Sequence, residues 1–223
     1  MAWSGGPNSG RGDERQRTLA RGWQSCHAAV PPIAPRSFIL SVTTSSSTTL
    51  SIRPATRDDL PRLMAIMDAA IGTLQQGFLD PAQIESSRAV MGLDRQLVDD
   101  GTYFAAELDG EIVGCGGWSR RATLYGGDHS AGLREPRLLD PASEAARVRA
   151  MYTDPAFARR GIGRALLAHC EAQARKEGFA SCELMGTRSG EPLYEVAGYA
   201  VIERIEDDRG GAPVPLARMR KAL

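Results

Sequence analysis

The stretch RVRAMYTDPAFARRGIGRALLAHCEAQARKEGF, residues 147–179, decides the fold of this chain. A β-type run over 146–153 leads through an Asp-Pro turn into a loop of arginines and glycines. A helix is predicted over 161–177, because apolar residues recur there at helical spacing and Gly178 follows as a terminating glycine. The stretch therefore predicts a strand, a glycine turn and an amphipathic helix in immediate succession.

The loop between this strand and this helix is a candidate phosphate site. Gly161 and Gly163 let the backbone approach a ligand closely, and Arg159, Arg160 and Arg164 add cationic donors. The N–H groups of a first helical turn have no intrahelical partner, and the helix dipole favours an anion there. Because glycine turns before helices are also common without any ligand, the surrounding sequence has to decide.

A dinucleotide site does not fit this loop. Such a site needs G-x-G-x-x-G directly after a strand, whereas Leu166 occupies the third glycine position and a seven-residue link separates Thr153 from Gly161. Glu183 stands where a ribose-binding acid would sit, but it belongs to a predicted strand. A Walker loop fails too, because the chain has no GKS or GKT.

The sequence before this stretch predicts two helical regions and a hairpin. The segment LSIRPATRDDLPRLMAIMDAAI is typical of a short strand followed by a helix capped by Thr56. A second helical stretch is expected over 80–100, broken near Gly92. Asp109-Gly110 between two β-type runs is a strong hairpin signal.

A loop over 120–145 follows the hairpin and is too long for a plain connector, so we expect it to help build a functional pocket. The order β-α-α-β-β-β-α-β-α-β-β predicts an α/β fold, a central mixed β-sheet flanked by helices. Its last elements are a strand over 180–186, a short helix over 190–197, and strands over 199–206 and 214–222.

Residues 1–48 differ in composition from everything after them. They are rich in glycine, serine and arginine, and the five arginines outnumber Asp13 and Glu14. Such a composition buries too little apolar surface to offset chain entropy, so we expect a disordered extension before a single domain at 49–223. A transit peptide and an extended translation start both fit this leader.

Bulk composition excludes several classes of function. The formal net charge is zero, which argues against a dedicated nucleic-acid binder. No apolar run approaches the length of a membrane span, and neither the cysteines nor the histidines have metal-site spacing. We therefore expect a soluble, cytoplasmic protein without a metal. Of its 27 basic residues only Lys176 and Lys221 are lysines, so a single arginine says little about function.

The stretch 147–179 closely resembles the central motif of the GNAT superfamily of acyl-CoA-dependent N-acetyltransferases. Arg160, Gly163 and Ala165 match the family's Q/R-x-x-G-x-G/A loop, whereas Ala158 replaces the Q/R in the register that uses Gly161. The run EPLYEVAGYAVIER resembles the family's closing helix and strand, except that the asparagine often found seven residues before its tyrosine is Thr187 here. The resemblance covers about residues 50–222.

The resemblance implies that the loop and the strand before it hold acetyl-CoA as co-substrate. The pyrophosphate would lie on the loop, and the pantetheine arm would pair with the backbone of the strand. The implied binding residues are Met151, Tyr152, Thr153, Arg159, Arg160, Gly161, Ile162, Gly163 and Arg164.

The resemblance also implies how the acetyl group would move. Tyr194 would be the general acid that protonates the departing thiolate, and a backbone N–H near Met151 and Tyr152 would stabilise the oxyanion. The general base is the least defined group, and Glu107 is the candidate for it. Asp128, His129 and water held by Tyr152 stay open as alternatives.

Two further features have a structural and a functional interpretation. In GCGGWSRR, 114–121, the repeated small residues indicate close approach of another backbone or of acceptor, and Trp118 is either a pocket wall or a core residue. Cys115 and Cys182 lie on predicted strands, where buried inert thiols are usual.

The predicted function is transfer of an acetyl group from acetyl-CoA to a primary amine, directly, within a ternary complex. The acceptor is a small-molecule or protein amine, with no nucleic acid or membrane as partner; a homodimer is left open. The alternative is a non-catalytic acyl-CoA-binding sensor or interaction module of the same fold.

Overall fold

The computed structural model describes residues 49–223, so the expectation of a disordered extension over 1–48 lies outside the described residues. The strands are β1 Leu50–Pro54, β2 Tyr103–Leu108, β3 Glu111–Ser119, β4 Ala146–Thr153, β5 Ser181–Thr187, β6 Ala200–Asp207 and β7 Val214–Ala222. The α-helices are α1 Leu60–Leu74, α2 Pro81–Val90, α3 Arg95–Asp99, α4 Ile162–Lys176 and α5 Glu191–Val196. Short 3-10 turns occupy η1 Arg57–Asp59, η2 Ala131–Leu133 and η3 Pro155–Phe157.

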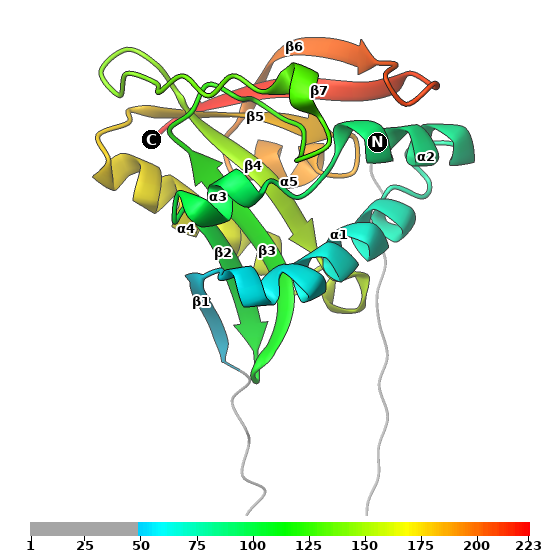
Figure 1. The fold of residues 1–223 in the computed structure, drawn as a ribbon, viewed down its shortest axis with the longest axis horizontal. Coiled ribbons are helices and arrows are strands. Elements are labelled where there is room, and N and C mark those ends of the chain that lie inside the picture. Colours follow the sequence, from blue (N-terminus) through cyan, green and yellow to red (C-terminus); the bar gives the residue numbers. More distant parts are fainter. Residues whose placement is uncertain (1–48) are drawn as a thin grey trace, which may run out of the picture. The chain divides into compact units, whose positions relative to one another are not determined.

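The strands form one seven-stranded sheet in the order β1-β2-β3-β4-β5-β7-β6 (Figure 1). Neighbouring strands are antiparallel except β4 and β5, which run parallel and are joined through α4. The mixed sheet with helices on its faces that the sequence predicted is confirmed. The order of its elements is also as expected, with α2 and α3 forming the second helical stretch on either side of the break near Gly92.

Helices cover the two faces of the sheet differently. Figure 1 shows α1 and α3 in front of the sheet and α4 behind it. On the front face, Leu63 and Leu97 are fully buried in one apolar cluster with Tyr103 and Tyr152. On the back face, the apolar stripe of α4 packs into a second cluster with β2 to β5, in which Leu166 is fully buried.

Local sequence explains where the elements begin and end. Thr56 forms a capping box with Asp59 ahead of α1, as its position predicted. Asp80 caps α2 by accepting a hydrogen bond from the backbone N–H of Gln83. The hairpin between β2 and β3 turns at Asp109 and Gly110, which both have positive φ angles, so that signal is confirmed as well.

The glycines of β3 make room for core side chains. A Cβ atom at Gly114 would lie 2.8 Å from the side chain of Ile162, and one at Gly117 would lie 2.6 Å from the ring of Tyr103. Trp118 is 2% exposed and packs edge-to-face against Phe179, so it is a core residue and no pocket wall. Close approach is confirmed for this run: neighbouring side chains and backbone cause it, including the Thr102 carbonyl, 2.7 Å from an added Cβ at Gly117, and no acceptor is needed to explain it.

Candidate active site

The cavity that defines the site lies where β4 and β5 separate. These strands pair only at Ala146 with Cys182 and at Arg147 with Glu183, and they diverge beyond those residues. The cavity is partly open to solvent. It is lined by Val90, Met91, Gly92, Leu124, Tyr125, Gly126, Val148, Arg149, Ala150, Met151, Tyr152, Met185, Thr187, Tyr194 and Leu216.

A β-bulge in β4 forms one side of this cavity. Arg149 and Tyr152 pair with β3, while Ala150 and Met151 together face a single residue of that strand. Ala150 has φ +52°, and its carbonyl accepts a hydrogen bond of 2.8 Å from the hydroxyl of Tyr103. Because a bulge leaves its extra residue outside the ladder, the backbone of β4 at Ala150 and Met151 is not fully paired with β3, and both residues line the cavity.

Tyr194 forms the opposite side of the cavity from a short helix, α5. Its ring lies against Gly186 and Gly190, where an added Cβ would be 3.3 Å and 3.0 Å away. No described residue hydrogen-bonds its hydroxyl, and burial raises the pKa of that phenol to about 12. Tyr194 therefore presents a protonated, unpaired O–H group to the cavity.

The loop that enters α4 has the geometry of an anion site. Gly161 is the residue before the helix and has φ +82°, a conformation that glycine adopts without strain. Arg159, Arg160 and Arg164 are exposed, and Arg160 lies over the ring of Phe157 at 5.2 Å. Within residues 49–223, Arg159 and Arg164 have no ion-pair partner. The open amides of the first turn and these free guanidinium groups suit a pyrophosphate.

Three segments that the sequence singled out separately meet at Gly163. A Cβ there would lie 3.2 Å from Leu193 of α5 and 3.7 Å from the hydroxyl of Thr153 at the end of β4. The helix entry, the central strand and the residue before Tyr194 therefore adjoin. The structure brings together Met151, Tyr152 and Tyr194 as cavity residues, with the arginine loop beginning beside them.

Glu107, the candidate base, lies elsewhere. It sits on β2 beside the outermost strand β1, and Arg53 holds its carboxylate at 2.8 Å while also holding Asp59. It is not among the residues that line the cavity. Because its charge is already paired and its side chain lies outside the cavity, the structure gives no support to Glu107 as the base.

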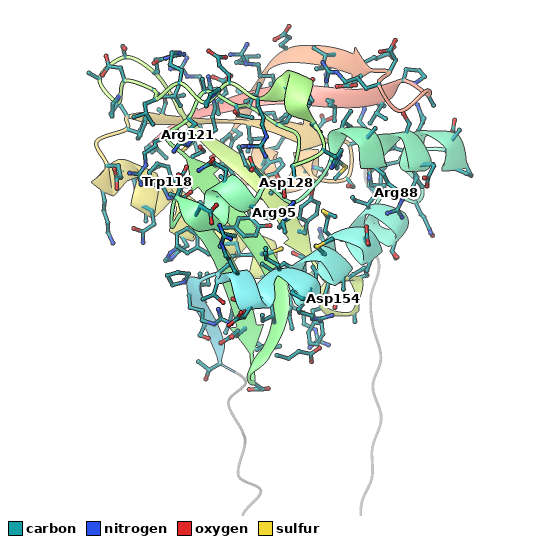
Figure 2. All side chains as sticks on the ribbon, in the orientation of Figure 1. Arg88, Arg95, Trp118, Arg121, Asp128 and Asp154 are labelled. Carbon is teal, nitrogen blue, oxygen red and sulfur yellow. The ribbon has the colours of Figure 1, made fainter. Side chains whose placement is uncertain are left out.

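The long loop 120–145 contributes Leu124, Tyr125 and Gly126 to the cavity wall. Asp128 and His129, the alternatives for the base, have other partners: Asp128 binds Arg95 at 2.5 Å, and the His129 ring lies 3.2 Å from the carbonyl of Ala89. Figure 2 shows Arg95 and Asp128 together in front of the sheet, away from Asp154 at the turn that follows β4.

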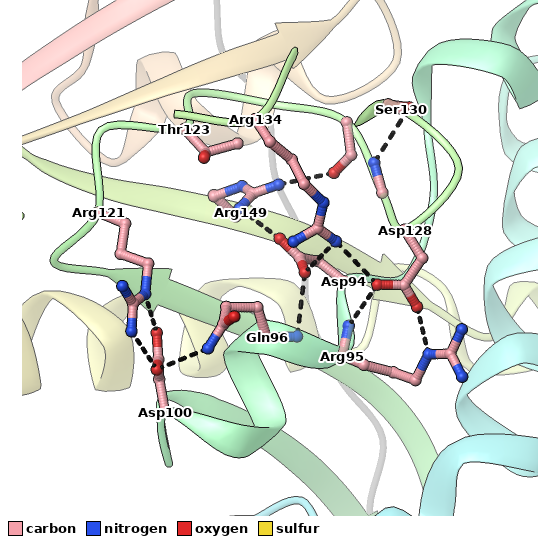
Figure 3. Close-up of polar contacts among 12 residues, drawn as sticks. Asp94, Arg95, Gln96, Asp100, Arg121, Thr123, Asp128, Ser130, Arg134 and Arg149 are labelled. Carbon is pink, nitrogen blue, oxygen red and sulfur yellow. Dashed lines mark hydrogen bonds and ion pairs between the residues drawn. The ribbon is translucent and has the colours of Figure 1, made fainter. Parts of the chain in front are cut away.

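The loop is held in place by a partly buried charge cluster that the sequence analysis missed, with Arg149 and Asp94 as its buried members. Arg149 binds Asp94 at 2.6 Å and the carbonyl of Gly126 at 2.7 Å (Figure 3). Arg134 binds both Asp94 and Asp128, so one cluster ties β4, α3 and the loop together. The available signal was two arginines of β4, Arg147 and Arg149. They stand at alternate positions of the strand, which puts both side chains on one face of the sheet.

The cysteines are poor nucleophiles in this environment. Cys115, Cys170 and Cys182 are buried free thiols, and burial raises the pKa of Cys115 and of Cys182 to about 12. Glu183 lies mid-strand as predicted and is bound by Arg147 and Arg218. Among residues 49–223, no three acidic, cysteine or histidine side chains are grouped to hold a metal ion. In the same range no helix is long and apolar enough to cross a membrane.

A comparison with sequence profiles of protein families identifies one family. The sequence profile described as acetyltransferase (GNAT) family matches residues 66–206. A comparison with curated protein sequences gives no match.

Solved structures share the fold at low sequence identity. A GCN5-related N-acetyltransferase from Rhodopseudomonas palustris has a TM-score of 0.59 at 19% identity, with 79% of this chain and 97% of that chain covered. PaiA N-acetyltransferase from Thermoplasma acidophilum, in complex with coenzyme A, has a TM-score of 0.52 at 17% identity, with 79% of this chain and 100% of that chain covered. A ribosomal-protein-alanine N-acetyltransferase from Brucella melitensis has a TM-score of 0.52 at 21% identity, with 78% of this chain and 99% of that chain covered.

Proposed function

The chain belongs to the acetyltransferase (GNAT) family, and we propose that it transfers an acetyl group from acetyl-CoA directly to a primary amine. The observation that carries this proposal is the cavity between β4 and β5, which has bulged backbone on one side and the hydroxyl of Tyr194 on the other. A small-molecule or protein amine is the acceptor.

Two parts of the chain would hold acetyl-CoA, which supplies the activated acetyl group. The amides from Arg159 to Arg164 at the start of α4 would bind the pyrophosphate, helped by guanidinium groups that have no ion-pair partner among the described residues. The backbone of Met151, Tyr152 and Thr153 would pair with the pantetheine arm beside the bulge. The complex of PaiA N-acetyltransferase with coenzyme A supports this choice of ligand.

Tyr194 would act as the general acid. Its hydroxyl keeps its proton at neutral pH, because burial raises its pKa to about 12, and no described group competes for it. Proton transfer from a positioned side chain contributes roughly 10²–10⁴-fold to rate. A backbone N–H at the bulge would stabilise the developing oxyanion. Direct transfer needs no thiol nucleophile, and none lines the cavity among the described residues; Cys115 of the neighbouring strand is fully buried and burial raises its pKa.

A thiol-release assay with acetyl-CoA and a panel of amines tests the proposal. We expect turnover in the wild type and a loss of roughly 10²-fold or more in kcat for Tyr194→Phe, with coenzyme A binding retained. Tyr199→Phe is the matched control: Tyr199 packs 6.0 Å from the Tyr194 ring, and its buried hydroxyl has no hydrogen-bond partner in residues 49–223. Its kcat should change less than about threefold.

Each alternative has its own outcome in this experiment. If coenzyme A raises the melting temperature but no amine is acetylated, the chain is an acyl-CoA-binding sensor or interaction module. If coenzyme A does not stabilise the fold at all, both functions are wrong. If Tyr199→Phe and Tyr194→Phe lose equal activity, the role of Tyr194 is in packing.

A further inference from the structure

The charged side chain in the wall of the cavity is a cation. Arg149 lines the cavity from β4, one residue before the bulge, and is only 6% exposed. Two of its nitrogens bind Asp94 and the carbonyl of Gly126, while its buried Nε has no hydrogen-bond partner in the described part of the chain. These contacts fix the guanidinium at the wall.

The groups behind Arg149 do not cancel its charge. Its cluster contains three arginines, Arg95, Arg134 and Arg149, and two aspartates, Asp94 and Asp128, which leaves one formal positive charge. Asp94 is shared between Arg149 and Arg134 and does not line the cavity. A cation that enters the cavity therefore meets a guanidinium before any carboxylate of this cluster.

The other ionisable groups around the cavity add no negative charge to its wall. The phenols of Tyr125, Tyr152 and Tyr194 line it, and burial is the first cause that raises the pKa of each, so all three stay neutral. Asp207 contacts Tyr125 from outside the cavity and is held by Arg209 at 2.6 Å.

A charged ammonium would lose its hydration here and gain a like-charge neighbour, which disfavours it. Resting on the proposed function, we propose that the acceptor is a weakly basic primary amine, such as the α-amine of a peptide, which enters the cavity uncharged, and that Arg149 sets this preference. The amine releases its proton to solvent before it binds.

Transfer of the acetyl group to such an amine then balances in bonds and protons without a carboxylate base. A bond forms between the amine nitrogen and the acetyl carbon as the carbon–sulfur bond breaks and sulfur keeps its electron pair. Tyr194 gives its proton to that sulfur and regains the one that the nitrogen loses. The products are a neutral amide and a thiol, and the enzyme returns to its starting protonation state.

Basicity then decides which amines react. A peptide α-amine has a pKa of about 7.7–8.0 and a lysine ε-amine about 10.4. At pH 7 the neutral fraction of the α-amine is therefore about 200-fold larger or more. We expect kcat/KM to favour the α-amine by about that factor, before any difference in fit.

The experiment compares two acceptors of the wild-type enzyme across roughly pH 6 to 10.5. One is a lysine-free tripeptide with a free N-terminus; the other is an N-acetylated tripeptide with one lysine. We expect kcat/KM to level near pH 8 for the first and to keep rising to about pH 10 for the second. An inflection at the same pH for both acceptors would place a general base on the enzyme and overturn the proposal, as would a preference for the lysine peptide at pH 7.

Variants of Arg149 test whether this side chain sets the preference. Arg149→Lys keeps the charge and should keep the preference, whereas Arg149→Gln should reduce it about tenfold. Because Arg149→Gln leaves the buried Asp94 with Arg134 as its remaining ion-pair partner, the double variant Asp94→Asn/Arg149→Gln removes the wall charge and its carboxylate together, and we expect it to fold. An unchanged preference in that double variant overturns the role of Arg149. Absence of turnover with every amine, with coenzyme A still bound, overturns the proposed function itself.

Discussion

Two groups of arginines lie near the same cavity and have opposite surroundings. Arg159, Arg160 and Arg164 surround the first turn of α4, exposed and within one short loop. Arg149 and Arg134 belong to a cluster whose members come from β4, α3 and the loop after β3, and Asp94 at its centre is 3% exposed in its side chain. The arginines of the first group have no ion-pair partner among the described residues, whereas those of the second group are paired with aspartates of the protein.

The difference shows that partners, more than residue type, decide what an arginine does. An exposed guanidinium beside open helix amides gains by binding a ligand phosphate. A buried guanidinium must be paired within the protein, because an unpaired buried charge is costly. We therefore expect mutations in the loop to affect ligand binding, and mutations in the cluster to affect folding and acceptor choice.

The largest expected effect is a loss of unfolding free energy when the ion pair of Arg149 and Asp94 is broken. Asp94→Ala leaves Arg149 buried without its carboxylate, and removing one partner of a buried pair costs about 3–5 kcal/mol. Urea unfolding followed by circular dichroism measures this loss. Asp94→Asn/Arg149→Gln is the control and should recover most of it, since no unpaired charge remains. A loss below about 1 kcal/mol for Asp94→Ala would show that the pair is solvated.

The next effect concerns ligand affinity at the loop. Arg159→Ala/Arg164→Ala should raise the dissociation constant of coenzyme A about tenfold at low salt, and less at high salt, because exposed charges are screened. Calorimetric titration measures it. Arg175→Ala, at the far end of the same helix, removes an exposed arginine without changing the loop and should leave the affinity unaltered. Equal effects from both variants would mean that only overall charge matters.

A smaller effect concerns the backbone of the loop. Gly161→Ala places a Cβ on a residue at φ +82°, which should cost about 1 kcal/mol of unfolding free energy even though the surrounding space is open. Gly132→Ala is the control, because its surroundings are equally open and its φ is not positive. If thermal unfolding shows the same midpoint for both variants, backbone conformation does not hold the helix entry.

The smallest expected effect is on the alkaline side of the pH profile. Burial raises the pKa of Tyr194 to about 12, so its protonated form persists well above neutrality. We expect kcat at saturating acceptor to stay within about twofold between roughly pH 7 and 10. A fall in kcat centred below pH 10 would show that a group other than Tyr194 supplies the proton.

Local sequence predicted the features that depend on a few neighbouring residues. The Asp109-Gly110 turn, the Thr56 cap and the helix after Gly161 follow from backbone preferences and apolar spacing, and all are present. The candidate base Glu107 and the glycines of β3 were harder to interpret. Their roles depend on Arg53, Ile162 and other residues far along the chain, which no local pattern identifies.

By itself, the sequence determined the elements, their order and the glycine and arginine loop before α4, because backbone conformation and helix termini are set within a few residues. Only the tertiary structure decided which side chains share the cavity. Where β4 diverges from β5, Met151 and Tyr194 line the same cavity, and Arg149 is the charged residue in its wall. Burial and charge pairing are properties of residues distant in the chain, so they exist only once the sheet has formed.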